Sequence, residues 1–177
     1  MTAQHRFETL YNEHAAAVVA YTRRRVSPSD ADDVVAEVFL TAWRRLEDIP
    51  DDAGIWLLGV ARRTLANKRR SQGRQAALQT RLTDESRHAA AQPADVETSG
   101  EQIRNALSNL SDSDRETLLL LGWEGLSNRD AAKVLGIRTG TFAVRLHRAR
   151  RNLSRALAAG TSATPQSTEP AINLEAQ

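Results

Sequence analysis

Apolar side chains recur at intervals of three and four residues along most of this chain, which is the spacing of helices that bury one face. Breaks in that rhythm fall at turn-forming clusters such as Ser27-Pro28 and the stretch EDIPDDAG at 47–54. The pattern predicts helices over residues 6–26, 31–46, 55 to beyond 74, 103–110, and then three more between 111 and 157. We therefore expect an all-α protein.

Residues 127–157 form the most informative stretch. Ser127 is a good N-cap residue, and Asp130 three positions later completes an approximate capping box. Gly136 follows at the point where a left-handed residue would end the first helix. On the longer helix beyond it, one arc of about 100° collects Phe142, Leu146, Ala149, Leu153, Ala156 and Leu157. A short helix, a glycine turn and a long second helix make a helix-turn-helix, whose second helix enters the major groove of DNA.

The charge on this stretch favours nucleic-acid binding over an ordinary helical hairpin. Residues 131–168 hold seven Lys and Arg side chains and no acid, whereas a helix that is only solvated usually alternates its signs. A second block at 53–83 also holds seven Lys and Arg and no acid, although the net charge of the chain is only +2. Two separate basic blocks favour contact with one extended polyanion at two places.

The second basic block falls on the helix that begins near residue 55. Its expected buried arc contains Trp56, Leu57, Val60, Ala61, Thr64 and Leu65. The opposite arc contains Gly59, Arg62, Arg63, Ala66, Asn67, Arg69 and Arg70. Because Gly59 and Ala66 are small, they leave a shallow depression in the helix surface between the arginines. We therefore expect a phosphate backbone to approach this side of the helix closely.

The helix predicted at 31–46 has an apolar half and a charged half. The apolar half, which is the expected core side, contains Val34, Val35, Val38, Phe39, Ala42, Trp43 and Leu46. The opposite arc contains Asp33, Ala36, Glu37, Leu40 and Arg44. A single exposed leucine is normal on a protein surface, but a leucine ringed by charges is also typical of a modest protein-docking face. The residues of this helix alone favour neither interpretation.

Composition narrows the classes of function. No run approaches the roughly 20 apolar residues of a membrane span, and the N-terminus has no signal-peptide core. The chain has no cysteine, and its four histidines are scattered without the spacing of zinc ligands. We therefore expect a soluble cytoplasmic protein with no metal and no cofactor.

Two polar segments divide the chain. Helical periodicity fades after residue 71, and residues 89–100 have the composition of a flexible linker. The tail at 159–177 is polar and is expected to be disordered. We predict one helical domain at 6–75, a linker at 76–100 and a second helical domain at 101–158.

Three blocks of this sequence, in this order, resemble the extracytoplasmic-function sigma factors of bacterial RNA polymerase. One block, DADDVVAEVFLTAWRRL, is similar to sigma region 2.2, which docks on the clamp helices of the polymerase β′ subunit. The next, WLLGVARRTLANKRR, is similar to regions 2.3 and 2.4, which open and read the −10 promoter element. The third, from LSDSDRETLLLLGW to RLHRARRNL, resembles region 4, which reads the −35 element and contacts the β flap. The departures Ala36, Arg63, Ala143 and Val144 leave the class intact but bear on the promoter sequence.

The resemblance implies a sigma factor that directs core polymerase to promoters and assists −10 strand opening, with an anti-sigma factor as a possible further partner. It implies polymerase docking through Asp33, Glu37, Leu40 and Arg44. It implies −10 contacts through Arg62, Arg63, Asn67, Arg69 and Arg70, with the loop at 47–54 helping to hold an unpaired base. It implies −35 contacts through Thr141, Val144, Arg145, His147, Arg148 and Arg151. Arginine can pair with guanine edges and apolar groups can meet thymine methyls, whereas Arg150, Arg151 and Arg155 are better placed for phosphates.

Two alternatives belong to other classes. A helix-turn-helix regulator that binds DNA without polymerase explains the second basic block and the charged face at 31–46 less well. An enzyme acting on nucleic acid would need metal ligands, for which the candidate carboxylates are Asp30, Asp32, Asp33 and Glu37.

Overall fold

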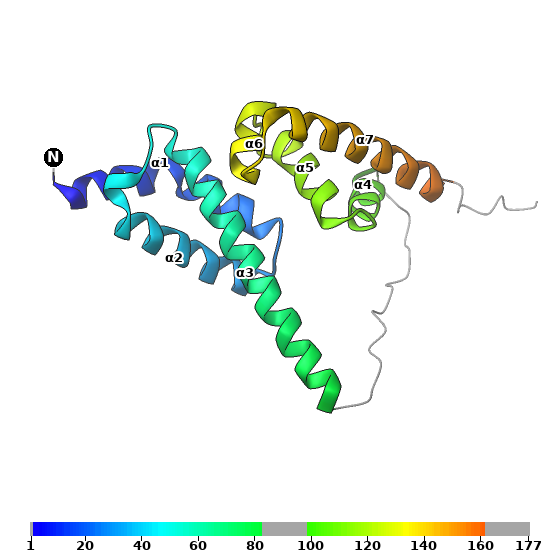
Figure 1. Ribbon diagram of the computed structural model, residues 1–177, viewed down its shortest axis with the longest axis horizontal. Helices are drawn as coiled ribbons and strands as arrows, with labels where there is room; N and C mark the ends of the chain where they lie inside the picture. Colours follow the sequence, from blue (N-terminus) through cyan, green and yellow to red (C-terminus); the bar gives the residue numbers. More distant parts are fainter. Residues whose placement is uncertain (1, 83–98, 162–177) are drawn as a thin grey trace, which may run out of the picture.

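The computed structural model describes residues 2–82 and 99–161, and within them every regular element is a helix, as predicted (Figure 1). The elements are α1 (Ala3–Arg23), α2 (Pro28–Arg44), a 3-10 turn (Leu46–Asp48), α3 (Ala53–Leu82), α4 (Ser99–Ser108), α5 (Asp112–Gly122), α6 (Asn128–Leu135) and α7 (Thr139–Thr161). Helix α3 therefore continues through the first residues of the predicted linker. Helix α4 begins inside that predicted linker at Ser99, and α7 extends to Thr161, so the first residues of the predicted tail are helical rather than disordered. Residues 83–98 of the linker and 162–177 of the tail lie outside the described residues.

Helices α1, α2 and α3 pack together as the N-terminal half. Val18, Val38 and Leu57 are each at most 1% exposed at the centre of this bundle. Helix α2 begins one turn earlier than its apolar pattern suggests, because Pro28 occupies the first helical position and the Ser27 hydroxyl accepts the amide hydrogen of Asp30. The N-cap of α2 is therefore Ser27.

The apolar half of α2 is buried as predicted except at its end. Val34, Val38 and Ala42 are within the core, but Trp43 is 48% exposed. Its ring meets Phe7 edge-on, with centroids 5.2 Å apart. Trp43 lies at the margin of the apolar arc, where α1 covers only one side of its ring, so its prediction as a core residue is wrong.

Helices α4 to α7 form the C-terminal half and contain the predicted helix-turn-helix. The Ser127 hydroxyl caps α6 by accepting the Asp130 amide at 3.1 Å. Gly136 ends α6 in the left-handed region with φ +66°, as predicted. On α7, Phe142 is fully buried and Leu146 and Ala149 are in the core, which confirms the first half of the predicted apolar stripe. Its second half, Leu153, Ala156 and Leu157, is only half-buried.

The two halves share one apolar core, because α6 packs against α3 (Figure 1). Val134 and Leu135 of α6 are buried in the same cluster as Leu57 and Val60 of α3. Gly59 is also buried, and a Cβ built on it would lie 3.9 Å from the carbonyl oxygen of Val134. The prediction that Gly59 leaves open ground for a phosphate backbone is therefore wrong in this conformation. Helix α6 covers the surface of α3 at Gly59.

Candidate nucleic-acid interface

The outer face of α7 carries most of the residues predicted to read the −35 element. Val144 is the most exposed large apolar side chain among the described residues, at 72%. Thr141, His147 and Arg151 are exposed on the same helix. Arg145 differs, because it is half-buried and turns toward the N-terminal half. The buried stripe of α7 holds these side chains on the outside of the helix-turn-helix.

Arg148 is held by an acid rather than left free. Its Nε and Nη2 donate to Asp114 Oδ1 at 3.3 and 3.1 Å, and Asn152 Nδ2 donates to the other oxygen at 2.6 Å. Burial by itself would raise the pKa of Asp114, but the hydrogen bonds from Asn152 and Arg148 hold that pKa below its ordinary value. Asp114 therefore joins α5 to α7 as a carboxylate, and Arg148 is oriented before any DNA arrives.

The residues predicted to contact the −10 element lie along α3 in three different environments. Arg63 is exposed. Asn67 and Arg70 are exposed too, and Arg70 Nη2 donates to Asn67 Oδ1 at 2.6 Å. Arg69 donates to the backbone oxygen of Arg25 at 3.3 Å, and its Nη1 lies 3.7 Å from Asp112 Oδ2. These contacts lead from the basic face of α3 toward the C-terminal half.

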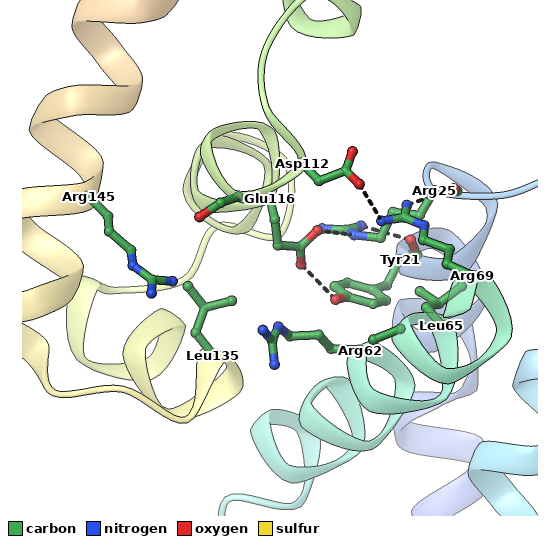
Figure 2. Close-up of a pocket in the computed structure, with 11 residues that line it drawn as sticks. Tyr21, Arg25, Arg62, Leu65, Arg69, Asp112, Glu116, Leu135 and Arg145 are labelled. Carbon is green, nitrogen blue, oxygen red and sulfur yellow. Dashed lines mark hydrogen bonds and ion pairs between the residues drawn. The ribbon is translucent and has the colours of Figure 1, made fainter. Parts of the chain in front are cut away.

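A cleft of about 240 Å³ lies where the two halves meet (Figure 2). Arg62 and Arg69 reach it from α3 and Arg145 reaches it from α7, so residues predicted for the −10 and −35 elements line the same cavity. Asp112 and Glu116 of α5 line it as well. The structure thus brings together arginines that the sequence assigned to separate promoter elements.

A buried polar network beside the cleft joins α1 to the C-terminal half (Figure 2). The Arg25 side chain is 3% exposed, and it donates to Glu116 at 2.7 Å and to Glu124 at 2.9 Å. Glu116 also accepts the Tyr21 hydroxyl at 2.7 Å. Burial, and then the charge of Glu116, raises the pKa of Tyr21, so this phenol stays a hydrogen-bond donor.

Sequence analysis missed this network. Its members lie far apart in the chain, and each of the charged members has an ordinary interpretation as a surface residue. The only hint was the position of Tyr21 on the apolar face of α1, where a buried hydroxyl needs a partner. Nothing in one sequence identifies Glu116 as that partner.

The predicted polymerase-docking face lies on the exposed side of α2. Leu40 is 54% exposed, and Glu37 and Arg44 are exposed on either side of it. The carboxylate of Asp33 lies 3.1 Å from Lys68 Nζ on α3, and Lys68 also contacts Asp30 at 2.7 Å. Because two of the four candidate metal-binding carboxylates are paired with a lysine, the arrangement suits an ion-pair cluster better than a cation site.

The fold and these surfaces define a two-part helical DNA-binding protein with a helix-turn-helix in its second half. Two family models match in the same order: "Sigma-70 region 2" covers residues 10–75 and "Sigma-70, region 4" covers residues 100–153. The ECF RNA polymerase sigma factor SigL of Mycobacterium tuberculosis is 35% identical over 151 residues, which cover 81% of this chain and 84% of that protein. The chain therefore belongs to the ECF RNA polymerase sigma factors, the subunits that direct the polymerase to promoters.

More distant matches are consistent with the same family. The ECF RNA polymerase sigma-E factor of Haemophilus influenzae is 27% identical over 157 residues, covering 81% of this chain and 83% of its own length. The sigma factor RpoE of Bartonella quintana, solved with the anti-sigma factor NepR, matches with a TM-score of 0.62 and 26% identity over 86% of this chain and 96% of that one. CnrH, solved with the cytosolic domain of CnrY, matches with a TM-score of 0.60 and 25% identity, covering 88% of this chain and 90% of that one.

Within the described ranges, every helix is too short or too polar to cross a bilayer.

Proposed function

We propose that this sigma factor divides its work among three helices. The exposed face of α2 docks on core polymerase, the basic side of α3 contacts the −10 element, and α7 reads the −35 element. The observation that carries the proposal is the match of sigma regions 2 and 4, in that order, to two helical halves that each carry a basic helix. We take these halves as the domains at 6–75 and 101–158.

Docking through α2 is supported by the exposure of Leu40 on a helix whose other side is buried. A 54% exposed leucine contributes little to folding, so its placement between Glu37 and Arg44 suits a partner surface better than a core. The clamp helices of the β′ subunit are the partner that the family implies. The β flap would contact the C-terminal half.

Reading of the −35 element by α7 is supported by the residues near its start, of which Val144 and His147 are exposed and Arg145 is half-buried. Arg145 and His147 can donate to base edges, and the methyl groups of Val144 can meet a thymine methyl. Arg148, already oriented by Asp114, reaches the same groove less freely. Arg151 lies further along α7 and suits a phosphate. Apolar Val144 on this face favours a promoter with thymine at the position it meets.

Contact with the −10 element is supported by the arginine-rich side of α3 and the loop before it. The loop at 47–54 begins within the 3-10 turn and runs into the start of α3 at Ala53, so a base pulled from the stack would meet both. Arg62, Arg63, Asn67, Arg69 and Arg70 supply hydrogen-bond donors along the adjoining helix face. Binding that favours the unpaired strand shifts the promoter toward the open form, which needs no covalent chemistry and no catalytic residue in this chain.

Run-off transcription with purified core polymerase on a genomic library tests the proposal. We expect start sites that share paired −10 and −35 sequences and that depend on added sigma factor. Failure to co-purify with core polymerase, together with sequence-specific duplex binding, would instead identify a regulator that acts without polymerase. The protein would work in the cytoplasm, where the polymerase is. The complexes of RpoE and CnrH support an anti-sigma factor as a further partner here.

A further inference from the structure

We propose that Asp114 is a positioning residue for promoter recognition, which orients Arg148 of α7 toward one guanine of the −35 element and shields the charge of that arginine from the phosphate backbone. The proposal deepens the proposed function, on which it rests for the assignment of α7 to the −35 element. The orientation of Arg148 itself rests on contacts within the C-terminal half.

Asp114 lies in the first turn of α5, which packs against α7 (Figure 1). Its side chain is 5% exposed, and its backbone amide donates to the Ser111 hydroxyl at 3.2 Å. The positive end of the α5 dipole stabilises a negative charge at this position. Asp114 therefore places a fixed negative charge beside the helix that is proposed to read DNA.

Arg148 reaches this carboxylate while most of its side chain stays in solvent. The side chain is 58% exposed, and its Nε and Nη2 atoms donate to Asp114. These two atoms form one edge of the planar guanidinium group. Of the residues that the structure describes, none forms a hydrogen bond with Nη1 of Arg148. The outer end of the group, which consists of Nη1 and the second hydrogen of Nη2, is therefore available to DNA.

That outer end has the donor geometry that guanine requires. Two N–H groups of one arginine pair with the O6 and N7 acceptors of guanine, which is the commonest specific contact in the major groove. Arg148 lies about one turn of α7 beyond Val144 and two turns beyond Thr141, on the same exposed side. Because the guanidinium is already fixed at its inner edge, it loses less conformational freedom when it binds a base in that direction.

The same carboxylate reduces the attraction of Arg148 for phosphate. The ion pair carries no net charge, whereas Arg151 has no acidic partner among the described residues. A phosphate near the pair is attracted by Arg148 and repelled by Asp114, so less counterion is released when DNA reaches it. Arg148 therefore contributes to discrimination between bases more than to affinity for any duplex.

A second branch of the network joins the next turn of α7 to the same carboxylate. Asn152 donates to the other oxygen of Asp114 through Nδ2, and its Oδ1 accepts from Arg155. Because an amide donates only through its nitrogen, Asp114 fixes which side of Asn152 meets Arg155. Asn152 and the buried stripe already join α7 to α5, so the additional bonds to Arg148 chiefly fix the orientation of an exposed side chain.

The first experiment removes the charge of Asp114 and measures DNA binding by the holoenzyme, which is the full chain with core polymerase. Promoter fragments carry every base pair in turn at each −35 position, with a scrambled −35 sequence as the non-specific reference. Arg148→Ala identifies the position that Arg148 reads, and we expect that position to prefer guanine. A loss of preference for a different base, or at no position, would overturn the proposal.

At the position so identified, Asp114→Asn should reduce the preference for guanine by about fivefold or more, the lower end of what a bidentate contact supplies. The released arginine should also tighten binding to the scrambled sequence. As salt falls from about 200 to 50 mM, that gain should grow by roughly threefold, because one more phosphate contact releases counterions. An unchanged salt dependence, or an undiminished preference for guanine, would overturn the proposal.

The salt dependence separates orientation of Arg148 from a loss of stability. A variant that only destabilises the C-terminal half binds every sequence more weakly and releases no additional counterions. Thr117→Ala on the same helix is the matched control, because Thr117 is fully buried and its hydroxyl donates to the Ser113 carbonyl without carrying a charge. It should leave both the preference for guanine and the salt dependence unchanged.

A second variant covers the case in which Asp114→Asn does not fold. Arg148→Lys keeps a positive charge beside Asp114 but lacks the planar group with a second donor edge. We expect its salt dependence to match that of the wild type and its preference for guanine to fall by about fivefold or more. Full retention of that preference by Arg148→Lys would overturn the proposal, whether or not Asp114→Asn folds.

The outcomes also separate this proposal from the proposed function. A wild-type holoenzyme that binds cognate and scrambled −35 sequences equally would overturn the assignment of α7 to the −35 element, and the reading of guanine with it. A sequence preference in the wild type that Asp114→Asn and Arg148→Lys both leave intact would overturn only the role of Asp114, and the proposed function would stand.

Discussion

The buried carboxylate of Asp114 offers a sharp test of how α5 and α7 are held together. Its side chain is 5% exposed and accepts from Asn152 at 2.6 Å and from Arg148 at 3.1 Å. The change Asp114→Asn keeps the shape, removes the charge and turns one acceptor oxygen into an amide group that faces donors. Hydrogen bonds to a charged group contribute about 1.5–3 kcal/mol. We expect the free energy of unfolding to fall by that amount at neutral pH.

The size of this loss should depend on pH. Because the folded-state pKa of Asp114 lies below its ordinary value of about 3.9, the ionised carboxylate stabilises the fold fully above that ordinary value. The stabilisation disappears as the pH falls through the folded-state pKa. A protonated aspartate resembles asparagine in shape and in its hydrogen bonds. The stabilities of the wild-type and Asp114→Asn chains should therefore begin to converge below about pH 4 and meet only below the folded-state pKa of Asp114.

Urea unfolding followed by circular dichroism, repeated from neutral pH to about pH 3, measures both effects across the titration range of Asp114. Asp32→Asn is the matched control, because Asp32 is 71% exposed and its pair with Arg23 is long, at 3.7 Å. We expect the control to change the free energy of unfolding by less than about 1 kcal/mol. The reasoning is refuted if Asp114→Asn costs no more than the control, or if its cost is unchanged at the acidic end.

Three further predictions concern binding. Leu40→Glu should abolish co-elution with core polymerase and leave the melting temperature near wild type, since Leu40 is half exposed; a folded variant that still co-elutes would contradict the docking face. In the holoenzyme, Arg145→Ala should weaken the binding free energy for a cognate −35 duplex by about 1–3 kcal/mol. Arg151→Ala should instead weaken binding to all duplexes and reduce the slope of log affinity against log salt by about one unit. Equal losses of affinity for cognate and scrambled duplexes in Arg145→Ala would refute this orientation of α7. Holoenzyme should prefer a promoter with a pre-melted −10 segment by about one to two decades, and Arg62→Ala/Asn67→Ala should shrink that preference in a competition assay at fixed salt; no preference in the wild type would rule out the strand-opening role.

Periodicity predicted the fold well where a helix has one buried side. The stripe of α7, the cap at Ser127 and the left-handed Gly136 all follow from local rules, because apolar spacing and capping chemistry act within a few residues. The exposure of Leu40 follows from the same projection of α2. Such rules need no knowledge of the rest of the chain.

The same projection failed where a helix is covered twice. Gly59 lies opposite the arc that α3 buries in its own bundle, so a single-arc pattern assigned it to solvent, and only the position of α6 makes it a buried residue. The buried polar network around Arg25 could not be predicted for a related reason. Pairings between residues of the two halves depend on how the halves meet, and a charged residue carries no periodic signal of its burial.

The packing of α6 on α3 also limits how such factors can be recombined. Exchanging the C-terminal half for that of a relative would set a foreign α6 against the surface around Gly59, where the Val134 backbone is in contact. A chimera of this kind should melt below both parents unless the residues of α6 that face α3 are transplanted back. New −35 specificity can then be grafted onto this chain through the outer face of α7, while the inner face of α6 has to be inherited together with α3.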